Sequence, residues 1–463
     1  MVMDSVMARF AERAPITVMA RLALQRALDS SWIDSLFEKH RHTQYTRELL
    51  FSTTVEIMSV VAVGLRPSVH AAAKAYLNLP VSITALYDKI NRTDPEVVRA
   101  LIQGSNERLE PVLQAMRQDS VTSVDGYRLR IIDGNHLPAT EKRLKPLRHF
   151  RGAALPGHSL VVYDPDTGLV IDLLPCEDAH AQERACMAPI LERAHAGELW
   201  IADRNFSTRA ILTSWHRRGS AFIVREHAAT PHPAVCAAPR TAGRIDSGIV
   251  SEQPVSIPDE GQHTPLSLRR IELQLDVPTD DGETVIRLLT NLPVSTFTAQ
   301  QIAGLYRRRW RIETMFQRLE AALNSEIATL GHPRAALLAF GVAVLAHNVL
   351  ALIERAVIIA HQLDRPDKEE KIELSAYYLA LEVKAGYAGM MIALPSNDWR
   401  CYDALNSQQL AQTLLTVAGH ADPHRLRKHK RGPKAPKKVG YVSGAEARKH
   451  VSTARVLKAG RIV

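Results

Sequence analysis

The chain has 463 residues, more than one hydrophobic core usually serves, and its 46% hydrophobic content is that of a globular protein. The net charge of +9 favours a polyanionic partner, and eight Lys or Arg without any acid lie in the single segment Arg425–Lys438. The four cysteines, Cys176, Cys186, Cys236 and Cys401, form no C-x-x-C pair, which fits a reducing cytoplasm and argues against a disulfide framework or a zinc cluster.

No secretory or membrane-spanning segment is expected. The N-terminus carries acids early and lacks a basic region followed by an apolar run. Two apolar stretches, Leu49–Leu65 and Ala335–Ala360, are interrupted by charged or polar residues and predict buried core helices. We therefore expect a cytoplasmic protein without a membrane partner.

Residues 1–120 are predicted to form a helical domain, because apolar residues recur three and four apart from Arg9 to Met116. Within it, "PSVHAAAKAYLNLPVSITALYDKINR" reads as a helix, a short break and a second helix that opens near Ser82, which is the shape of a helix-turn-helix. Thr84 and Lys89 on the second helix are candidate DNA contacts. Other helical hairpins share this pattern, so it does not by itself establish DNA binding.

A mixed α/β core is predicted for residues 121–224. The strand patterns "YRLRIIDGNHL" and "SLVVYDPDTGLVIDLLP" precede a helix from about residue 181 to 196, the strand "GELWIADRNF", a helix capped by Ser207, and the strand "AFIVRE". Asp133 and Asp203 each lie at or near the carboxyl end of an apolar strand, where open α/β sheets bind ligands.

The rest of the chain divides into three parts. Short β segments separated by Pro, Gly and Asp predict an all-β insertion over residues 225–292. A long helix and two more apolar helices follow, and we assign them to a second part of the core, residues 293–392. The C-terminal region, residues 393–463, contains the basic tail, which we expect to be disordered when free and to bind DNA nonspecifically. A solvated run that keeps the chain soluble is the alternative.

The segment "GLYRRRWRIETMFQRLE", residues 304–320, predicts a helix with three faces, and Thr298 with Gln301 forms a capping box before it. One face is apolar. The second carries Arg307, Arg308, Arg311 and Arg318, and the border between the two carries Tyr306, Arg309, Glu313 and Glu320.

Each acidic residue has an ordinary explanation by itself. Glu313 pairs at i,i+4 with Arg309, Asp133 precedes a glycine as turn residues do, and Asp203 could cap a helix. Together, two strand-end aspartates and a helix glutamate supply the hard oxygen ligands of a divalent cation. Two magnesium ions at such a site activate a water and stabilise the leaving oxygen of a phosphodiester. Neighbouring arginines and a tyrosine would then hold the phosphates.

Three motifs resemble the DDE transposases of bacterial insertion sequences, which are RNase H-like enzymes of the cut-and-paste type. They are "IIDGNHL", "WIADRNFSTRAIL" and "YRRRWRIETMFQRL". The last is similar to the family's tyrosine, arginine, glutamate, lysine signature at Tyr306, Arg309 and Glu313. The resemblance implies an RNase H-like α/β catalytic core with a β insertion, and it implies that Asp133, Asp203 and Glu313 are catalytic and bind two Mg²⁺, with Mn²⁺ as a substitute.

The resemblance also implies the partners. Tyr306 and Arg309 would contact transposon-end phosphates, the N-terminal domain would recognise the inverted repeats, and a homodimer would hold two ends together. Two features depart from the family. The signature lysine is Glu320 here, and no Phe, Tyr or Trp lies between Arg225 and Thr296, where some relatives trap a flipped base.

We therefore expect a metal-dependent DNA endonuclease and strand transferase that acts at the bacterial nucleoid. The alternatives are an inactive or domesticated DNA-binding protein, and a nuclease that cuts without strand transfer. The histidines His136, His158, His180 and His227 show no metal-ligand spacing and receive no role.

Overall fold

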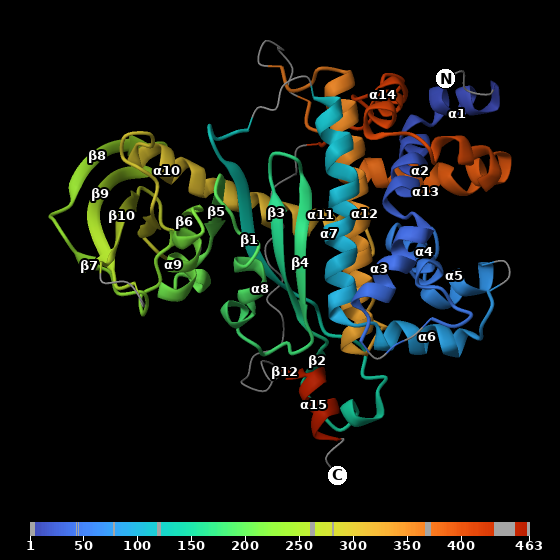
Figure 1. The fold of residues 1–463 in the computed structure, drawn as a ribbon, viewed down its shortest axis with the longest axis horizontal. Coiled ribbons are helices and arrows are strands. Elements are labelled where there is room, and N and C mark those ends of the chain that lie inside the picture. Colours follow the sequence, from blue (N-terminus) through green and yellow to red (C-terminus); the bar gives the residue numbers. More distant parts are fainter. Residues whose placement is uncertain are drawn as a thin grey trace.

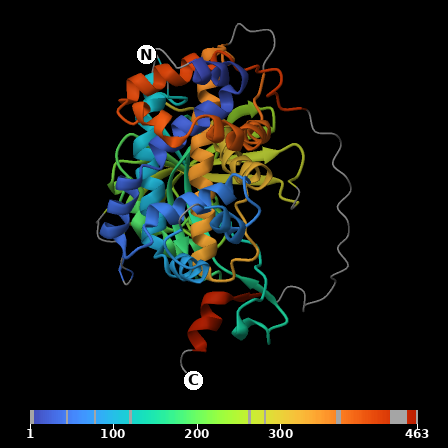
Figure 2. The same ribbon diagram turned by 90° about the vertical axis from the view of Figure 1, so that its right-hand side faces the viewer.

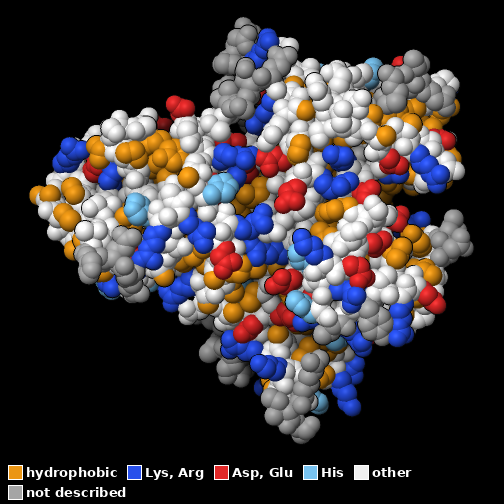
Figure 3. All heavy atoms as spheres, in the orientation of Figure 1, with side chains coloured by type: hydrophobic (Ala, Val, Ile, Leu, Met, Phe, Trp, Pro, Cys, Tyr) orange, Lys and Arg blue, Asp and Glu red, His pale blue; other side chains and the backbone are white. Residues whose placement is uncertain are grey.

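The computed structural model describes residues 5–42, 44, 46–76, 79–117, 122–259, 264–279, 282–365, 372–429 and 450–460. Figure 1 shows a central β-sheet between a helical half and a lobe built from antiparallel strands. On the face drawn in Figure 3, acidic side chains lie among the basic ones. Residues 430–438, which hold most of the basic segment, lie outside the described part of the chain, so the expectation that the tail is disordered stays a prediction.

The N-terminal region is helical, as predicted, in the residues that the structure describes. Asp29, Ser68 and Ser82 each cap a helix by accepting a hydrogen bond from a backbone N–H, which satisfies one of the amides that a helix start leaves unpaired. The predicted helix-turn-helix corresponds to α5 and α6. The helices of this region are α1 (Ser5–Arg13), α2 (Pro15–Ala27), α3 (Ser30–His40), α4 (Phe51–Ala62), α5 (Val69–Ala75), α6 (Ile83–Arg92) and α7 (Pro95–Met116).

Five strands form the core of the sheet, in the order β4-β3-β1-β5-β6. β3 is antiparallel to both of its neighbours, whereas β1, β5 and β6 run parallel to one another. This order and these directions are those of an RNase H-like core, so the predicted fold class is confirmed. The strands are β1 (Arg128–His136), β3 (His158–Asp164), β4 (Leu169–Cys176), β5 (Glu198–Ala202) and β6 (Ala221–Arg225).

The two faces of this sheet pack against different helices, because alternate side chains point to opposite faces. Ile131 and Ile201 belong to the larger hydrophobic core, which also contains residues of α7, α11 and α12. Ile132 and Trp200 belong to a smaller core on the other face, which contains residues of α9 (Arg209–Arg217).

The predicted insertion is all-β in its described residues, and its strands continue the core sheet. β11 pairs antiparallel with β6, and the order then continues through β10 and β9 to β7, while β8 pairs with β9. The lobe at the far end of the sheet in Figure 1 is therefore hydrogen-bonded to the core. Its strands are β7 (Ala234–Val235), β8 (Arg240–Ile245), β9 (Gly248–Ile257), β10 (Leu266–Leu275) and β11 (Val285–Thr290).

Helices follow the insertion and form the second part of the core. α10 (Ala299–Tyr306) begins with the predicted capping box of Thr298 and Gln301. α12 (Pro333–Ala360) is long and apolar enough to cross a membrane, but its most apolar 18-residue window is 100% buried inside the described structure. The Asn348 side chain binds both the N–H and the C=O of Val170, each at 2.8 Å, and so joins α12 to β4.

The last helix of the second part of the core is α13 (Ala376–Ala393). The C-terminal region adds the 3-10 turn η5 (Ser396–Tyr402), α14 (Ser407–Ala418), β12 (His450–Ser452) and α15 (Thr453–Ala459), and another 3-10 turn, η1 (Lys145–Leu147), lies earlier in the chain. β12 pairs in parallel with β2 (Ala153–Leu155) to form a separate two-stranded sheet. Figure 2 shows α15 projecting beyond the rest of the molecule. Arg455 of α15 forms an ion pair with Asp178 at 2.8 Å.

Three local expectations are wrong. In place of one helix over residues 181–196, the chain has a 3-10 turn, η2 (Glu183–Cys186), and the short α8 (Ala188–Leu191), in which Pro189 lies in the first turn, where its missing N–H costs no helical hydrogen bond. Thr208 rather than Ser207 caps α9, since η3 (Arg204–Phe206) ends immediately before Ser207. The long helix after the insertion is interrupted by the 3-10 turn η4 (Arg307–Arg309), which separates α10 from α11 (Trp310–Ala322).

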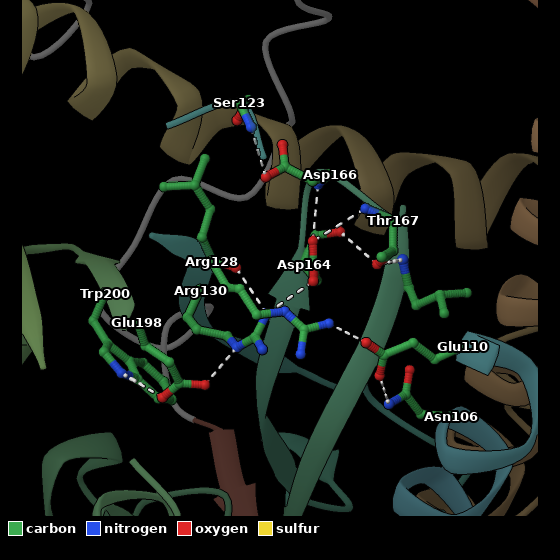
Figure 4. Close-up of polar contacts among 12 residues, drawn as sticks. Asn106, Glu110, Ser123, Arg128, Arg130, Asp164, Asp166, Thr167, Glu198 and Trp200 are labelled. Carbon is green, nitrogen blue, oxygen red and sulfur yellow. Dashed lines mark hydrogen bonds and ion pairs between the residues drawn. The ribbon is translucent and has the colours of Figure 1, made fainter. Parts of the chain in front are cut away.

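A buried ion-pair network joins the strands in the first half of β1 (Figure 4). Arg130 donates to Glu198 and to Asp164, each at 2.8 Å, and these three side chains are at most 6% exposed. Trp200 Nε1 also donates to Glu198, at 3.2 Å. Because each buried charge has partners, the network links β1, β5 and the β3–β4 hairpin without leaving a lone buried ion.

Candidate active site

Asp133 and Asp203 lie side by side on adjacent parallel strands. The last pair in the register of β1 and β5 is Ile132 opposite Ala202, and the aspartates follow directly on each strand. By alternation both carboxylates belong to the face of the larger hydrophobic core, where α11 contacts β1. Glu313 is in the first turn of α11. The structure therefore brings the three predicted acidic residues to the same face at one end of the sheet.

Arg309 joins two of these acids. Its Nη1 donates to Asp133 Oδ2 at 2.9 Å and its Nη2 donates to Glu313 Oε1 at 2.8 Å. The Arg309 side chain is only 11% exposed, so this is more than the surface salt bridge that i,i+4 spacing alone would make. The guanidinium places a cation between the first and third acids.

Tyr306 contacts the remaining acid. Its hydroxyl donates to Asp203 Oδ1 at a long 3.4 Å, and the residue is buried. Burial raises the pKa of Tyr306, and the Asp203 carboxylate raises it further, so the phenol stays protonated and acts as a donor. The tyrosine and arginine of the resemblance therefore contact the acids in this structure.

Asp133 has an unusual proton affinity. Burial raises the pKa of Asp133 to about 6, Arg309 and the Gly134 N–H oppose this shift, and the carboxylates of Glu183 and Asp203 add to it. A buried carboxyl beside other acids is costly to ionise, and a cation bound next to it would stabilise its charged form.

Glu183 is a fourth acid near the site that sequence reasoning did not identify. It lies on η2, and its side chain covers Gly134 so closely that a Cβ there would come within 1.9 Å of Glu183 Oε1. Asn205 Nδ2 donates to its other oxygen at 3.2 Å. Gly134 is thus needed for close approach, and Glu183 lies on the face of β1 opposite to Asp133.

The predicted DNA-contacting arginines fall into two groups. Arg307 and Arg311 are exposed, and Arg308 is half-buried and donates to Ser123. Arg318 instead forms an ion pair with Glu354 of α12 at 3.0 Å. The structure therefore places Arg318 toward the core rather than beside the acids.

The candidate contacts on α6 also separate. Thr84 is exposed, whereas the Lys89 ammonium lies over the Phe37 ring at 4.2 Å and donates to Leu49 O at 3.4 Å. Burial lowers the pKa of Lys89. In this structure Lys89 packs within the helical domain, and Thr84 faces solvent.

Two further features beside the acids were not found from the sequence. Trp310, next to Arg309, is 60% exposed, although a tryptophan in a helix is usually read as a core residue. A hollow that begins at Arg204, the residue after Asp203, is also lined by Arg225 and Arg287, and Glu283 there forms ion pairs with Arg204 and Arg225. Their separation in the sequence gave no reason to group them.

The acids fit divalent metal ions. They offer oxygen ligands without sulfur. The Arg309 guanidinium binds Asp133 and Glu313, which shows that a positive charge between these two carboxylates is favourable. Asp133, Asp203 and Glu313 would hold the ions.

Glu320, at the signature lysine position, is exposed. The pKa of Glu326 is raised mainly by the burial of Glu326 itself, and the charge of Glu320 raises it further.

The region that holds the three acids matches a known protein family. Residues 125–349 match the family model described as "Transposase DDE domain". This region contains all three acids and the strands and helices that hold them. No curated protein matches the sequence. The chain therefore carries a transposase DDE domain over residues 125–349, and this match supports a DDE transposase.

Proposed function

We propose that this transposase binds the terminal inverted repeats of its own insertion sequence, cleaves their ends and joins the 3′-hydroxyls to target DNA. The observation that carries this proposal is the adjacency of Asp133 and Asp203 on parallel strands, with Arg309 linking Asp133 to Glu313. Such a constellation suits phosphoryl transfer, in which positioning and electrostatic stabilisation do most of the catalysis.

Asp133, Asp203 and Glu313 act by holding metal. When bound there, two Mg²⁺, for which Mn²⁺ substitutes, activate a water or a 3′-hydroxyl and stabilise the leaving oxygen. Tyr306 keeps Asp203 in place through its hydroxyl, and its buried ring gives that hydroxyl one position. Arg309 holds Asp133 and Glu313 through its two donors, and a metal held by these acids would neutralise them in its place and leave the guanidinium available to a DNA phosphate.

DNA is held by the surface around the acids. Arg307 and Arg311 contact phosphates, and the exposed Trp310 ring offers a stacking face to a displaced base. The helical N-terminal domain reads the inverted repeats, with the exposed Thr84 of α6 at the contact. A homodimer, each subunit bound to one end, brings both ends to the target at the nucleoid.

The test uses labelled duplex DNA from the ends of the element that encodes the chain. Wild type and Glu313→Gln are compared in Mg²⁺ and in Mn²⁺, and Glu192→Gln is the matched control because Glu192 is exposed at the end of α8, which packs on the smaller hydrophobic core. We expect nicking at a defined end and joined products with wild type and with the control. Glu313→Gln should lose cleavage by at least about 10³-fold, the scale of losing a group that stabilises the transition state, while keeping DNA binding.

Two results would replace this proposal. Specific binding without cleavage by any of the three proteins would identify an inactive DNA-binding descendant of a transposase. Defined cleavage without joined products, when target DNA is present, would identify a nuclease that lacks strand transfer.

A further inference from the structure

Three sulfur and nitrogen ligands meet on the face of the sheet opposite to the acidic residues. The side chains of His158, Cys176 and Cys186 each offer one ligand atom, and these atoms all lie within 4.8 Å of one another. The Cys176 and Cys186 sulfurs are 3.9 Å apart. The sequence spacing of the cysteines had argued against such a cluster, but the fold brings them together.

The sheet register explains how the cluster forms. His158 begins β3 and pairs directly with Cys176 at the end of β4, so the two side chains lie on the same face. His136 of β1 pairs with His158 in turn, and their rings are stacked with centroids 5.1 Å apart. Cys186 comes from η2, ten positions after Cys176, and approaches from above that face.

His158 is the part of the cluster that calls for a ligand. The residue is 0% exposed, and no hydrogen bond of good geometry joins its buried Nδ1 or Nε2 to a described residue, although the Cys176 side chain and the Asp178 backbone interact with the ring. Buried polar groups normally have well-placed partners, so this imidazole is weakly satisfied without a ligand. A metal ion within the cluster would satisfy one of these nitrogens.

The distances favour zinc over a disulfide. Two thiolates that bind one tetrahedral zinc at about 2.3 Å lie about 3.8 Å apart, close to the 3.9 Å between the two sulfurs here. A disulfide needs its sulfurs about 2.05 Å apart.

We propose that His158, Cys176 and Cys186 are three protein ligands of a bound zinc ion, whose fourth tetrahedral position is open to water. This ion is distinct from the magnesium ions of the acidic site, because thiolate and imidazole select a softer metal than carboxylates do. It would fasten η2 to the end of the β3–β4 hairpin, next to the strand that carries Asp133. The proposal does not depend on the transposition chemistry.

The first test measures metal content. The full chain is purified without a histidine tag under reducing conditions from cells grown with zinc, and the metal is determined by mass spectrometry. We expect about one zinc per chain. Cys176→Ser, Cys186→Ser and His158→Gln should each lose it, while the matched variants Cys236→Ser and Cys401→Ser, which change exposed cysteines, should retain it.

The second test uses the unaltered chain, so it does not depend on how the variants fold. Cobalt(II) is added to metal-free wild-type protein, and we expect a thiolate-to-cobalt charge-transfer band with the intense visible bands of a tetrahedral site. Asp133→Asn should give the same spectrum, because its change lies in the acidic site. A natively folded wild type that takes up neither zinc nor cobalt would overturn the proposal. So would a Cys176–Cys186 disulfide in peptide maps of protein kept under reducing conditions.

Discussion

The Tyr306 hydroxyl is the polar group that connects the interrupted helix to the second aspartate. Tyr306→Phe removes only this donor and keeps the buried ring. Because the acceptor is the charged Asp203 carboxylate but the bond is long, at 3.4 Å, we expect the free energy of unfolding to fall by about 1–2 kcal/mol. End cleavage should fall by about tenfold, because Asp203 is less well held.

The measurements are urea unfolding and single-turnover cleavage. Tyr378→Phe is the control, because that tyrosine lies on α13, where its ring contacts those of Tyr377 and His429. Equal cleavage by Tyr306→Phe and wild type would show that the hydroxyl does not position Asp203.

Glu320 allows the signature lysine to be restored. The side chain is exposed, so Glu320→Lys should leave the fold intact and relieve repulsion from Glu326. If this position faces DNA, end binding becomes tighter and the slope of log K against log salt steepens by about 1, as one new phosphate contact requires. Filter binding at several salt concentrations checks this, and an unchanged slope with Glu320→Lys would place the position away from DNA.

At the residue scale the sequence predicted the three acids and the pairing of Arg309 with Glu313, but not the partners of the two aspartates. Asp133, Asp203 and Glu313 could be proposed because strand ends and helix faces follow from local patterns. The contacts from Arg309 to Asp133 and from Tyr306 to Asp203 depend on where α11 crosses the sheet, which local patterns do not determine. The His158–Cys176 pair depends in the same way on the register of β3 and β4.

Secondary-structure elements are held together by the Arg130 network, and its loss should destabilise the core. Arg130→Ala leaves the buried carboxylates of Glu198 and Asp164 without their cation, so the free energy of unfolding should fall by about 3–5 kcal/mol. Arg128→Ala is the matched control on the same strand, because Arg128 is 43% exposed where it pairs with Glu110. That change should cost less than about 1 kcal/mol. Similar losses in urea unfolding for the two variants would contradict the network's role.

His347 on α12 predicts how the stability of the fold depends on pH. Burial lowers the pKa of His347 to about 4, with Arg318 lowering it further, and its ring contacts Gly168 O at 3.2 Å. The folded chain therefore keeps the ring neutral, whereas the unfolded chain takes up a proton as pH falls through about 6.5. This residue should cost about 2 kcal/mol of stability between pH 8 and pH 5.

Urea unfolding of wild type and His347→Gln at pH 8, 7, 6 and 5 measures this contribution. The variant should lose less stability than wild type over that range, and His420→Gln, which changes an exposed histidine, should behave like wild type. Parallel pH profiles for wild type and His347→Gln would rule out the buried neutral ring.

The elements that sequence patterns predicted correctly are those whose local signals agree. The capping box of Thr298 and Gln301 and the β pattern of the insertion lie where expected. A helix was wrongly extended through Pro189, because the apolar spacing around it outweighed the proline in the prediction. The break at Arg307–Arg309 had no local signal, since arginine is a good helix former.

Across the whole molecule, the catalytic core and the helical domain share one hydrophobic core. α7 of the N-terminal region packs against both α12 and β4, and residues of α2, α4, α7, α12 and α14 contribute to a single cluster. Figure 1 shows α7 and α12 side by side at this junction. Domain limits drawn from composition alone could not show this, because apolar helices on either side of a predicted boundary give the same pattern.

The basic segment Arg425–Lys438 carries much of the positive charge with which the whole molecule would attract DNA. Within Arg425–Lys438, Leu426 is buried and Lys428 pairs with Glu373, so the first residues belong to the fold. Residues 430–438 contain five Lys or Arg. Changing these five to Ser should weaken binding to the end sequence and to unrelated DNA by the same factor, because phosphate contacts carry no sequence information.

The slope of log K against log salt should become shallower by up to about 4.5, which is about 0.9 for each lost contact. A variant with residues 430–438 in shuffled order keeps the charge and should bind as wild type does. Fluorescence anisotropy with both DNAs at several salt concentrations gives the affinities and the slopes. A loss limited to the end sequence, or a loss in the shuffled variant, would show that the segment reads sequence and is more than a diffuse positive charge.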